Sequence, residues 1–274
     1  LDYTSNHGIA TSIGHSPITS LIDAGSGSRN SVAEALTNLI WAPLDNKLKS
    51  VSLSANWMWP ANNKGENARL YEAVKSCSDF CIELGINIPT GKDSMSMKQK
   101  YSNKEVLSPG TVIISATAHT DNIRNSVEPF LHNNKSNLYY INMSSCQYEL
   151  GGSALFQANN KIGEKCNDVK SAKDFKNIFN TIQDCIKDGL IYSGHDISSG
   201  GLITCLLEMC FVSDNIGMNI DLSNIDEKNI IKLLFSENHG IVFQSTTEIE
   251  KYLNQSKIIY HRIGKCMIGD KVII

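Results

Sequence analysis

The stretch that decides the fold is Ser26-Gly27-Ser28-Arg29-Asn30-Ser31-Val32-Ala33-Glu34-Ala35-Leu36-Thr37-Asn38-Leu39. Small and hydroxyl-bearing residues open it, and apolar residues then recur at helical spacing as far as Ile40. A stripe of this kind predicts an amphipathic helix whose apolar face packs against a sheet.

Two polar side chains of this predicted helix, Glu34 and Asn38, lie one turn apart. Residues four positions apart sit above one another on a helix, so a carboxylate and an amide oxygen can reach one hard cation there. Mg²⁺ prefers oxygen ligands of this kind. The spacing alone favours an ordinary solvated pair, because exposed polar pairs are common. The rest of the chain has to decide between the two interpretations.

Length and charge restrict the class of protein. The 274 residues allow two domains or one large one. A net charge of -3 provides no basic field for nucleic acid or for an anionic membrane, so we expect neither as a partner. Apolar runs are shorter than a membrane span and no signal-like segment stands at the start, so we expect a cytoplasmic protein. The opening at Leu1 has neither methionine nor helix cap, and we expect a cut edge there.

The first half of the chain alternates strand and helix patterns. We expect strands over 18–22, 49–55 and 110–119, and a helix over 66–84 that Gly85 closes as its C-terminal cap.

A possible phosphate loop follows the next strand pattern, at Thr90-Gly91-Lys92-Asp93-Ser94. Backbone amides and the Lys92 ammonium could share the charge of a phosphate or a phosphorylated sugar, with Asp93 and Ser94 beside them. The segment is not a P-loop, because GxxxxGK[ST] is absent. An ordinary turn with a surface lysine explains the same residues equally well.

A polar segment over 132–137 separates two patterned regions. We place a domain boundary there, which gives domains over 1–132 and 138–274. The second domain again alternates, with strands expected over 138–143, 190–192, 217–222, 240–244 and 258–263, and helices over 175–186, 227–235 and 248–253.

Another cluster of polar residues comes where one of these strands ends, at Ser193-Gly194-His195-Asp196-Ile197-Ser198-Ser199-Gly200-Gly201-Leu202. The carboxylate of Asp196 and the hydroxyl of Ser198 stand before paired glycines at the start of a helix. An α/β fold exposes backbone amides and positions ligands at such a place. His195 is either a general acid or base or, more commonly for such a residue, packed under the loop.

These blocks together resemble the phosphoribosylformylglycinamidine synthase family in its large single-chain form. The matching blocks are spread over nearly the whole chain: Gly27-Ser28-Arg29, Ala33-Glu34-Ala35-Leu36-Thr37-Asn38, Leu53-Ser54-Ala55-Asn56-Trp57-Met58, Leu70-Tyr71-Glu72-Ala73, Ile88-Pro89-Thr90-Gly91-Lys92-Asp93-Ser94-Met95-Ser96-Met97, His195-Asp196 and Gly200-Gly201-Leu202.

The resemblance implies an α/β (α+β) fold of the aminoimidazole ribonucleotide synthetase superfamily. It implies most of the second synthetase repeat: a truncated N-terminal sheet domain followed by a C-terminal α/β domain. The implied enzyme is a ligase of purine biosynthesis, which converts formylglycinamide ribonucleotide, glutamine and ATP to formylglycinamidine ribonucleotide. The first synthetase repeat and the glutaminase domain would be its partners in the same polypeptide, and we expect this segment alone to be inactive.

The resemblance also implies roles for individual residues. Glu34, Asn38 and Asp196 resemble Mg²⁺ ligands for a bound ATP or ADP, and Ser198 resembles a nucleotide contact. Lys92, Asp93 and Ser94 remain a candidate loop for phosphate or substrate. A further metal ligand of the family, an Asp, should lie just before Leu1 and is not in this sequence. No catalytic residue is assigned.

Two alternatives stay open at this point. The repeat could be a scaffold that holds ADP and Mg²⁺ structurally, without turnover. More remotely, the chain could be another kinase or synthetase of the superfamily, such as a thiamine-phosphate kinase or a selenophosphate synthetase. The Asn56-Trp57-Met58 and Lys92-to-Met97 blocks argue against the latter two, and a selenophosphate synthetase would also need a reactive N-terminal Cys or Sec loop.

Overall fold

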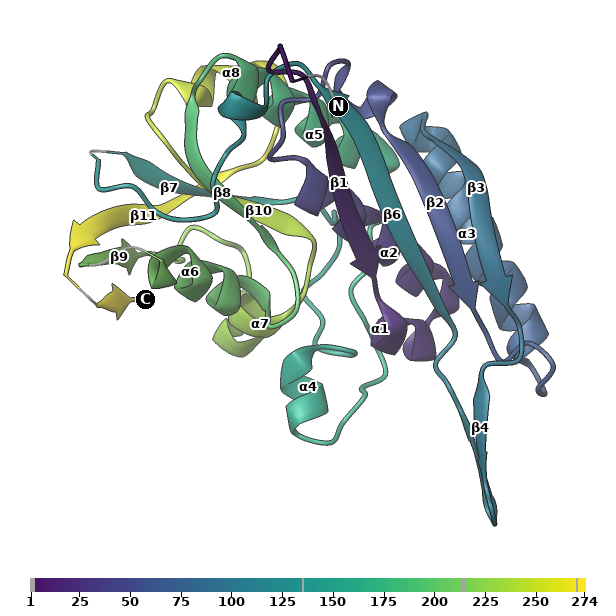
Figure 1. The fold of residues 1–274 in the computed structure, drawn as a ribbon. Coiled ribbons are helices and arrows are strands. Elements are labelled where there is room, and N and C mark those ends of the chain that lie inside the picture. Colours follow the sequence, from purple (N-terminus) through teal and green to yellow (C-terminus); the bar gives the residue numbers. More distant parts are fainter. Residues whose placement is uncertain (1–2, 135, 213–214, 270) are drawn as a thin grey trace.

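The computed structural model describes residues 3–134, 136–212, 215–269 and 271–274, which form two main sheets with helices against them (Figure 1). The first sheet has the order β1-β6-β2-β3. Its strands are β1 (Gly8–His15), β2 (Ser52–Met58), β3 (Asn87–Ser94) and β6 (Thr111–Thr120). Strand β6 pairs antiparallel with both β1 and β2, and β2 pairs parallel with the edge strand β3.

Helices cover one face of this sheet. They are α1 (Pro17–Ile22), α2 (Ala24–Leu39) and α3 (Glu66–Leu84), and the 3₁₀ turns η1 (Lys47–Ser50) and η2 (Ile123–Asn125) lie in the connections. A two-stranded hairpin of β4 (Lys98–Tyr101) and β5 (Lys104–Leu107) projects from the lower end of the sheet in Figure 1.

The second sheet has the order β12-β9-β11-β7-β10-β8 and is antiparallel except for the short edge pair of β12 with β9. Its strands are β7 (Asn137–Asn142), β8 (Ile191–Ile197), β9 (Ile216–Ile220), β10 (Gly240–Ser245), β11 (His261–Ile268) and β12 (Val272–Ile273). The helices of this half are α4 (Ala154–Ala158), α5 (Ala172–Lys187), α6 (Gly201–Phe211), α7 (Ile230–Phe235) and α8 (Ile249–Gln255).

Several sequence predictions are confirmed. The organising helix exists as α2, and α3 has the predicted bounds. Gly85 closes α3 in the left-handed conformation, with φ of +76°, and its amide donates to the carbonyls of Cys81 and Ile82. The mixed α/β fold class is confirmed as well.

Several element predictions are wrong in kind or in bounds: the strand expected over 258–263 begins at His261, and the helix expected over 227–235 begins at Ile230. Residues 18–22 form helix α1, because Pro17 suits a first helical turn and the Ser20 hydroxyl donates to the Ser16 carbonyl at 3.0 Å. The strand expected over 49–55 begins at Ser52, since η1 occupies the preceding residues.

The predicted loop over 90–94 is also wrong, because this segment continues strand β3. Gly91 pairs with Ala55 and Ser94 pairs with Met58 on β2. A Cβ atom at Gly91 would lie 2.6 Å from the Ala55 carbonyl oxygen, so the glycine permits close strand approach rather than a turn.

One hydrophobic core joins the two halves of the chain. It contains Leu36 and Ile114 from the first half with Phe179 and Phe243 from the second, all fully buried. The rings of Phe80 on α3 and Phe175 on α5 meet edge to face across the same contact, with centroids 6.1 Å apart. The first sheet ends at Thr120 and the second begins at Asn137, so each half has its own sheet while the core is shared. The domain boundary at 132–137 stays a prediction.

Gln183 of α5 supplies the buried polar link across this core. Its side-chain amide donates to the carbonyls of Ile40 at 2.5 Å and Ala42 at 2.9 Å, and its carbonyl accepts from the Leu44 amide at 2.8 Å. The residue is only 3% exposed. One side chain therefore satisfies three backbone groups where the chain leaves α2.

We expect Gln183→Ala to lower the free energy of unfolding by about 3 kcal/mol, because it leaves these buried backbone groups without partners. Urea unfolding of the purified chain measures the change. The matched control is Lys47→Ala, which breaks the 2.6 Å ion pair with Asp184 across the same junction. Both of those side chains are more than 40% exposed, so the control should cost less than about 1 kcal/mol. Equal losses in the two variants would contradict this account of Gln183.

Candidate functional site

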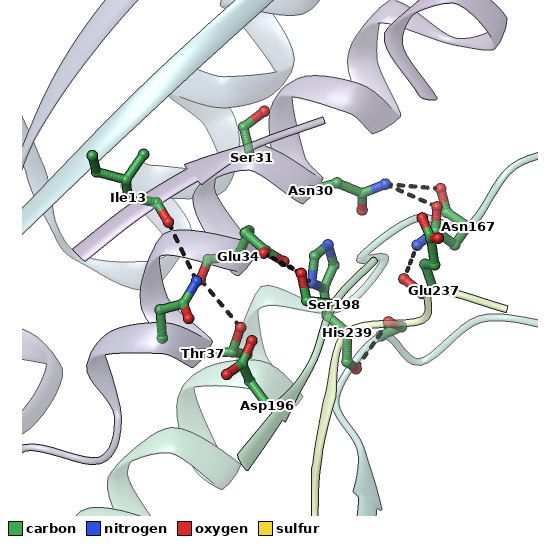
Figure 2. A network of polar contacts seen from close by, with 12 residues as sticks. Ile13, Asn30, Ser31, Glu34, Thr37, Asn167, Asp196, Ser198, Glu237 and His239 are labelled. Carbon is green, nitrogen blue, oxygen red and sulfur yellow. Dashed lines mark hydrogen bonds and ion pairs between the residues drawn. The ribbon is translucent and has the colours of Figure 1, made fainter. Parts of the chain in front are cut away.

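Helix α2 and the end of strand β8 bring two predicted site residues into contact. The Ser198 hydroxyl donates to Oε1 of Glu34 at 2.6 Å, and Figure 2 shows the two side chains pointing toward one another. The close packing of β1 on α2 places Glu34 there. A Cβ atom at Gly14 would lie 2.2 Å from the Ser31 carbonyl oxygen and 2.3 Å from the Ala35 nitrogen, so only glycine lets β1 lie on the helix at this point.

The other two predicted oxygen ligands lie beside this contact. Asp196 is the penultimate residue of β8, with 7% of its surface exposed, and its negative charge acts on Glu34. The Asn38 side-chain nitrogen donates to the carbonyls of Ile13 at 3.3 Å and Glu34 at 3.1 Å. These bonds fix the amide and leave its oxygen available to a ligand.

A cavity of about 90 Å³ opens at the Glu34–Ser198 contact. Both halves of the chain contribute to it, and its wall is polar. The lining residues are His15, Ser16, Thr19, Glu34, Asn167, Ser198, Ser199, Glu237 and His239. Asn38 and Asp196 are outside this wall, so the structure gathers the four predicted residues at one place without putting all of them on one surface.

The charge of the site is negative and poorly compensated. Burial is the main cause that raises the pKa of Glu34 from 4.5 to about 7; the Ser198 hydrogen bond lowers this pKa, and the charges of Asp196 and Glu237 raise it. Burial also raises the pKa values of Asp196 and Glu237. Burial lowers the pKa of His239 to about 4, so this imidazole is neutral at pH 7. No lysine or arginine stands among the described residues that line the cavity.

This donor set fits a hard divalent cation. Carboxylate, amide and hydroxyl oxygens are the ligands that Mg²⁺ takes in proteins, and a cation would compensate the clustered negative charge. Within the described ranges, no three His, Cys, Asp or Glu side chains lie close enough to form a metal site by themselves. A cation at Glu34 and Asp196 would therefore also need the oxygen of Asn38, water or ligand atoms.

Glu237 and Asn167 support the site, and sequence reasoning missed both. Oε1 of Glu237 accepts hydrogen bonds from the amides of Ala154 at 2.7 Å and Gly200 at 2.8 Å, and so joins two glycine-rich turns. The Asn167 side chain donates to the Glu237 carbonyl and accepts from the Asn30 side chain of α2 at 3.2 Å. The only sequence signal was a polar run, Ser236 to His239, directly before a buried strand.

His195 lies beside Asp196 and outside the cavity wall. Its Nδ1 is 2.7 Å from the Asp196 carbonyl oxygen, and its Nε2 is 3.3 Å from Oε2 of Glu208 on α6. The imidazole therefore contacts α6 and the backbone of β8, and its role as an acid or base stays untested.

Lys92, Asp93 and Ser94 are not brought to this site. They lie on the edge strand β3, three strand spacings from β1 or roughly 14 Å. Nζ of Lys92 donates to the Asp93 carbonyl at 2.8 Å and to the Ser94 hydroxyl. Lys92 and Asp93 border a separate open cavity of about 320 Å³ beside β2. Any phosphate contact they make is distinct from the Glu34 site.

The helices of the described ranges are all too short or too polar to cross a membrane.

Two family models match successive parts of the chain. Residues 1–119 match the FGAR-AT PurM_N-like domain, and residues 143–265 match the C-terminal domain of AIR synthase related proteins.

Curated relatives and solved structures agree with these matches. Over 86% of its length the chain is 38% identical to a Homo sapiens protein named phosphoribosylformylglycinamidine synthase, and over 97% it is 38% identical to a Caenorhabditis elegans protein named as a probable member. It spans 18% and 21% of the length of these relatives.

T. maritima PurL complexed with FGAR shares the fold at a TM-score of 0.73 with 11% identity, over 96% of this chain and 42% of that one. The same protein complexed with ADP matches at 0.69 with 10% identity, over 100% of this chain and 44% of that one. At sequence identities this low, the similarity to these structures shows a shared fold and nothing more.

We expect Glu34→Gln to stabilise the metal-free protein at high pH. A carboxyl group whose pKa is raised on folding stabilises the folded state below its unfolded pKa of 4.5, and this contribution is lost as pH rises through about 7. The amide keeps an acceptor for Ser198 but never ionises. In EDTA at pH 8 the variant should therefore be more stable than the wild type by about 3 kcal/mol.

Urea unfolding at pH 5 and pH 8 measures this difference, which should fall to about 1 kcal/mol or less at pH 5. Glu72→Gln, on the exposed side of α3, is the control and should leave the pH dependence unchanged. If the Glu34→Gln variant is no more stable than the wild type at pH 8, burial does not disfavour the ionised form of Glu34 in the folded protein.

Proposed function

Because the chain belongs to the phosphoribosylformylglycinamidine synthase family, we propose that it is part of the ATP-dependent synthetase region of such an enzyme. That region converts formylglycinamide ribonucleotide, glutamine and ATP to formylglycinamidine ribonucleotide in purine biosynthesis. The enzyme is a ligase, and we place it in the cytoplasm. Since the chain spans about a fifth of its curated relatives, the complete activity also needs the first synthetase repeat and the glutaminase domain.

The observation that carries the proposal is the contact of Glu34 with Ser198 between the two halves. Glu34, Asn38 and Asp196 would hold Mg²⁺ by oxygen atoms, and the Ser198 hydroxyl would contact ATP or ADP. Bound there, Mg²⁺ would neutralise phosphate charge, which is the main requirement of phosphoryl chemistry. The protein's own contribution is to hold these oxygens in a partly buried site, where Glu34 retains only 16% exposure of its side chain.

A second candidate function is a nucleotide-stabilised scaffold that does not turn over. The position of the site favours it: the cavity lies where the two halves share their core, and its wall comes from both. A ligand there would bind only the assembled fold, and would therefore stabilise it.

The first synthetase repeat of the same polypeptide would cover the face of the first sheet that lies opposite its helices. Ile9 and Ile13 on the edge strand β1 are 58% and 59% exposed, and alternate residues of β1 and β6 face the same side. Exposed apolar side chains on a sheet favour burial against another surface. Lys92, Asp93 and Ser94 remain a proposed phosphate or substrate contact on the opposite edge.

We expect ADP with Mg²⁺ to raise the thermal midpoint of the chain. A ligand that binds only the folded state stabilises it by about 2.7 kcal/mol at one hundred times its Kd, which corresponds to roughly 5 °C or more for a protein of this size. Differential scanning fluorimetry measures the shift. Asp196→Asn should abolish it, while Asp79→Asn on exposed α3 serves as the matched control and should retain it. A shift that survives Asp196→Asn would place the nucleotide elsewhere.

Measurements on the full-length enzyme can distinguish the catalytic function from the scaffold function. Asp196→Asn should reduce kcat at least about a hundredfold, or roughly 3 kcal/mol of transition-state stabilisation, if this site does chemistry. If it is a scaffold, kcat at a permissive temperature should stay near the wild-type value while the midpoint of unfolding falls. Steady-state assays and calorimetry on the same preparations distinguish the two outcomes.

A further inference from the structure

His239 is a buried imidazole in the cavity, and neither the proposed function nor any predicted site uses it. It precedes β10, is 5% exposed, and lines the cavity together with Glu34, Ser198 and Glu237. Its backbone is fixed, because its carbonyl oxygen accepts from the Met143 amide at 2.9 Å and from the Ser144 hydroxyl at 3.1 Å. The backbone that carries the side chain is thus fixed at the start of the strand.

Nδ1 of this imidazole has no hydrogen-bond partner. Buried polar atoms are almost always paired, with protein, water or a bound ion, so an unpaired one needs an explanation. A neutral imidazole has one ring nitrogen with a free lone pair, and an Nδ1 atom without a hydrogen-bond partner can offer that lone pair to a cation.

The atom that Nδ1 faces is the unused oxygen of Glu34. Nδ1 lies 3.5 Å from Oε2, while Oε1 already accepts the Ser198 hydroxyl at 2.6 Å. The distance from Nδ1 to Oε2 is too long for a good hydrogen bond. It is close to the separation of about 3 Å between neighbouring ligands that each lie about 2.1 Å from one metal ion.

We propose that Nδ1 of His239 and Oε2 of Glu34 bind the same divalent cation, which makes this an oxygen and nitrogen site that prefers Mn²⁺ to Mg²⁺. The inference rests on the proposed function, since it assumes the cation at Glu34. Mg²⁺ seldom accepts an imidazole in place of oxygen, whereas first-row transition metals bind imidazole readily. His239 would thus add a ligand and determine which metal the site selects.

The experiment uses the wild-type chain loaded with Mn²⁺ alone. Titration followed by the electron paramagnetic resonance of free Mn²⁺, with Mg²⁺ as a competitor, gives both affinities. We expect Mn²⁺ to bind roughly tenfold more tightly than Mg²⁺. Pulsed spectra of the bound ion should show modulation from a directly coordinated nitrogen, and isotopic labelling of the histidines should change that modulation. This readout needs no variant.

Two variants identify the ligands. His239→Gln should remove the nitrogen modulation and most of the preference for Mn²⁺, while Mg²⁺ still binds. His261→Gln is the matched control, because His261 lines a different cavity and should leave the nitrogen modulation and the Mn²⁺ preference unchanged. Glu34→Gln should weaken both metals at least about tenfold, because it removes the charged ligand.

The outcomes separate the inference from the proposed function. If Mn²⁺ binds in a manner sensitive to Glu34→Gln but shows no nitrogen modulation, His239 only neighbours Glu34, and this inference fails while the cation site stands. If neither metal binding responds to Glu34→Gln, the cation site itself fails, and the proposed function with it.

Discussion

The structure depends on the burial of helix α2 between the two halves of the chain. Of its sixteen residues, only Arg29, Glu34 and Asn38 keep appreciable exposure. A helix enclosed on nearly all sides needs small residues wherever another backbone approaches. Gly27 meets the backbone of Ser20 in this way, and Gly14 of β1 meets the helix from the other side. The small residues that open α2 are therefore a packing requirement.

The three residues of α2 with appreciable exposure also make polar contacts with the surrounding segments. Arg29 forms two hydrogen bonds of 2.8 Å with the carboxylate of Asp168, a paired geometry that fixes the loop before α5. Glu34 meets Ser198, and Asn38 ties the helix to β1 through Ile13. The helix that joins the two halves is thus the one that presents the candidate ligands, so the site forms only when the halves pack together.

This arrangement sets stability against function at Glu34. A carboxylate held among other carboxylates with 16% exposure is unfavourable to the folded state, as its raised pKa indicates. Stable folding would favour a neutral residue there, and a bound cation reverses the balance by compensating the charge. The folded state tolerates the unfavourable burial of the Glu34 carboxylate because the apolar core around α2 is continuous through both halves. A catalytic site and a structural nucleotide site would both need a bound cation to compensate the charge of Glu34. The geometry alone therefore supports both functions.

The sequence by itself determined the organising helix, the class of fold and the family, and it proposed Glu34, Asn38, Asp196 and Ser198 as candidate ligands. The helix follows from periodicity, whereas the family and the proposed ligand roles follow from the resemblance of short motifs, and both kinds of signal are local in the chain. Only the tertiary structure decided that Thr90 to Ser94 is an edge strand far from Glu34, and that Glu237, Asn167 and His239 stand around the cavity. Their positions depend on pairing and packing between segments as much as 205 residues apart, as in the contact of Glu34 with His239. No local pattern encodes such contacts, because burial and strand register are set by the whole fold.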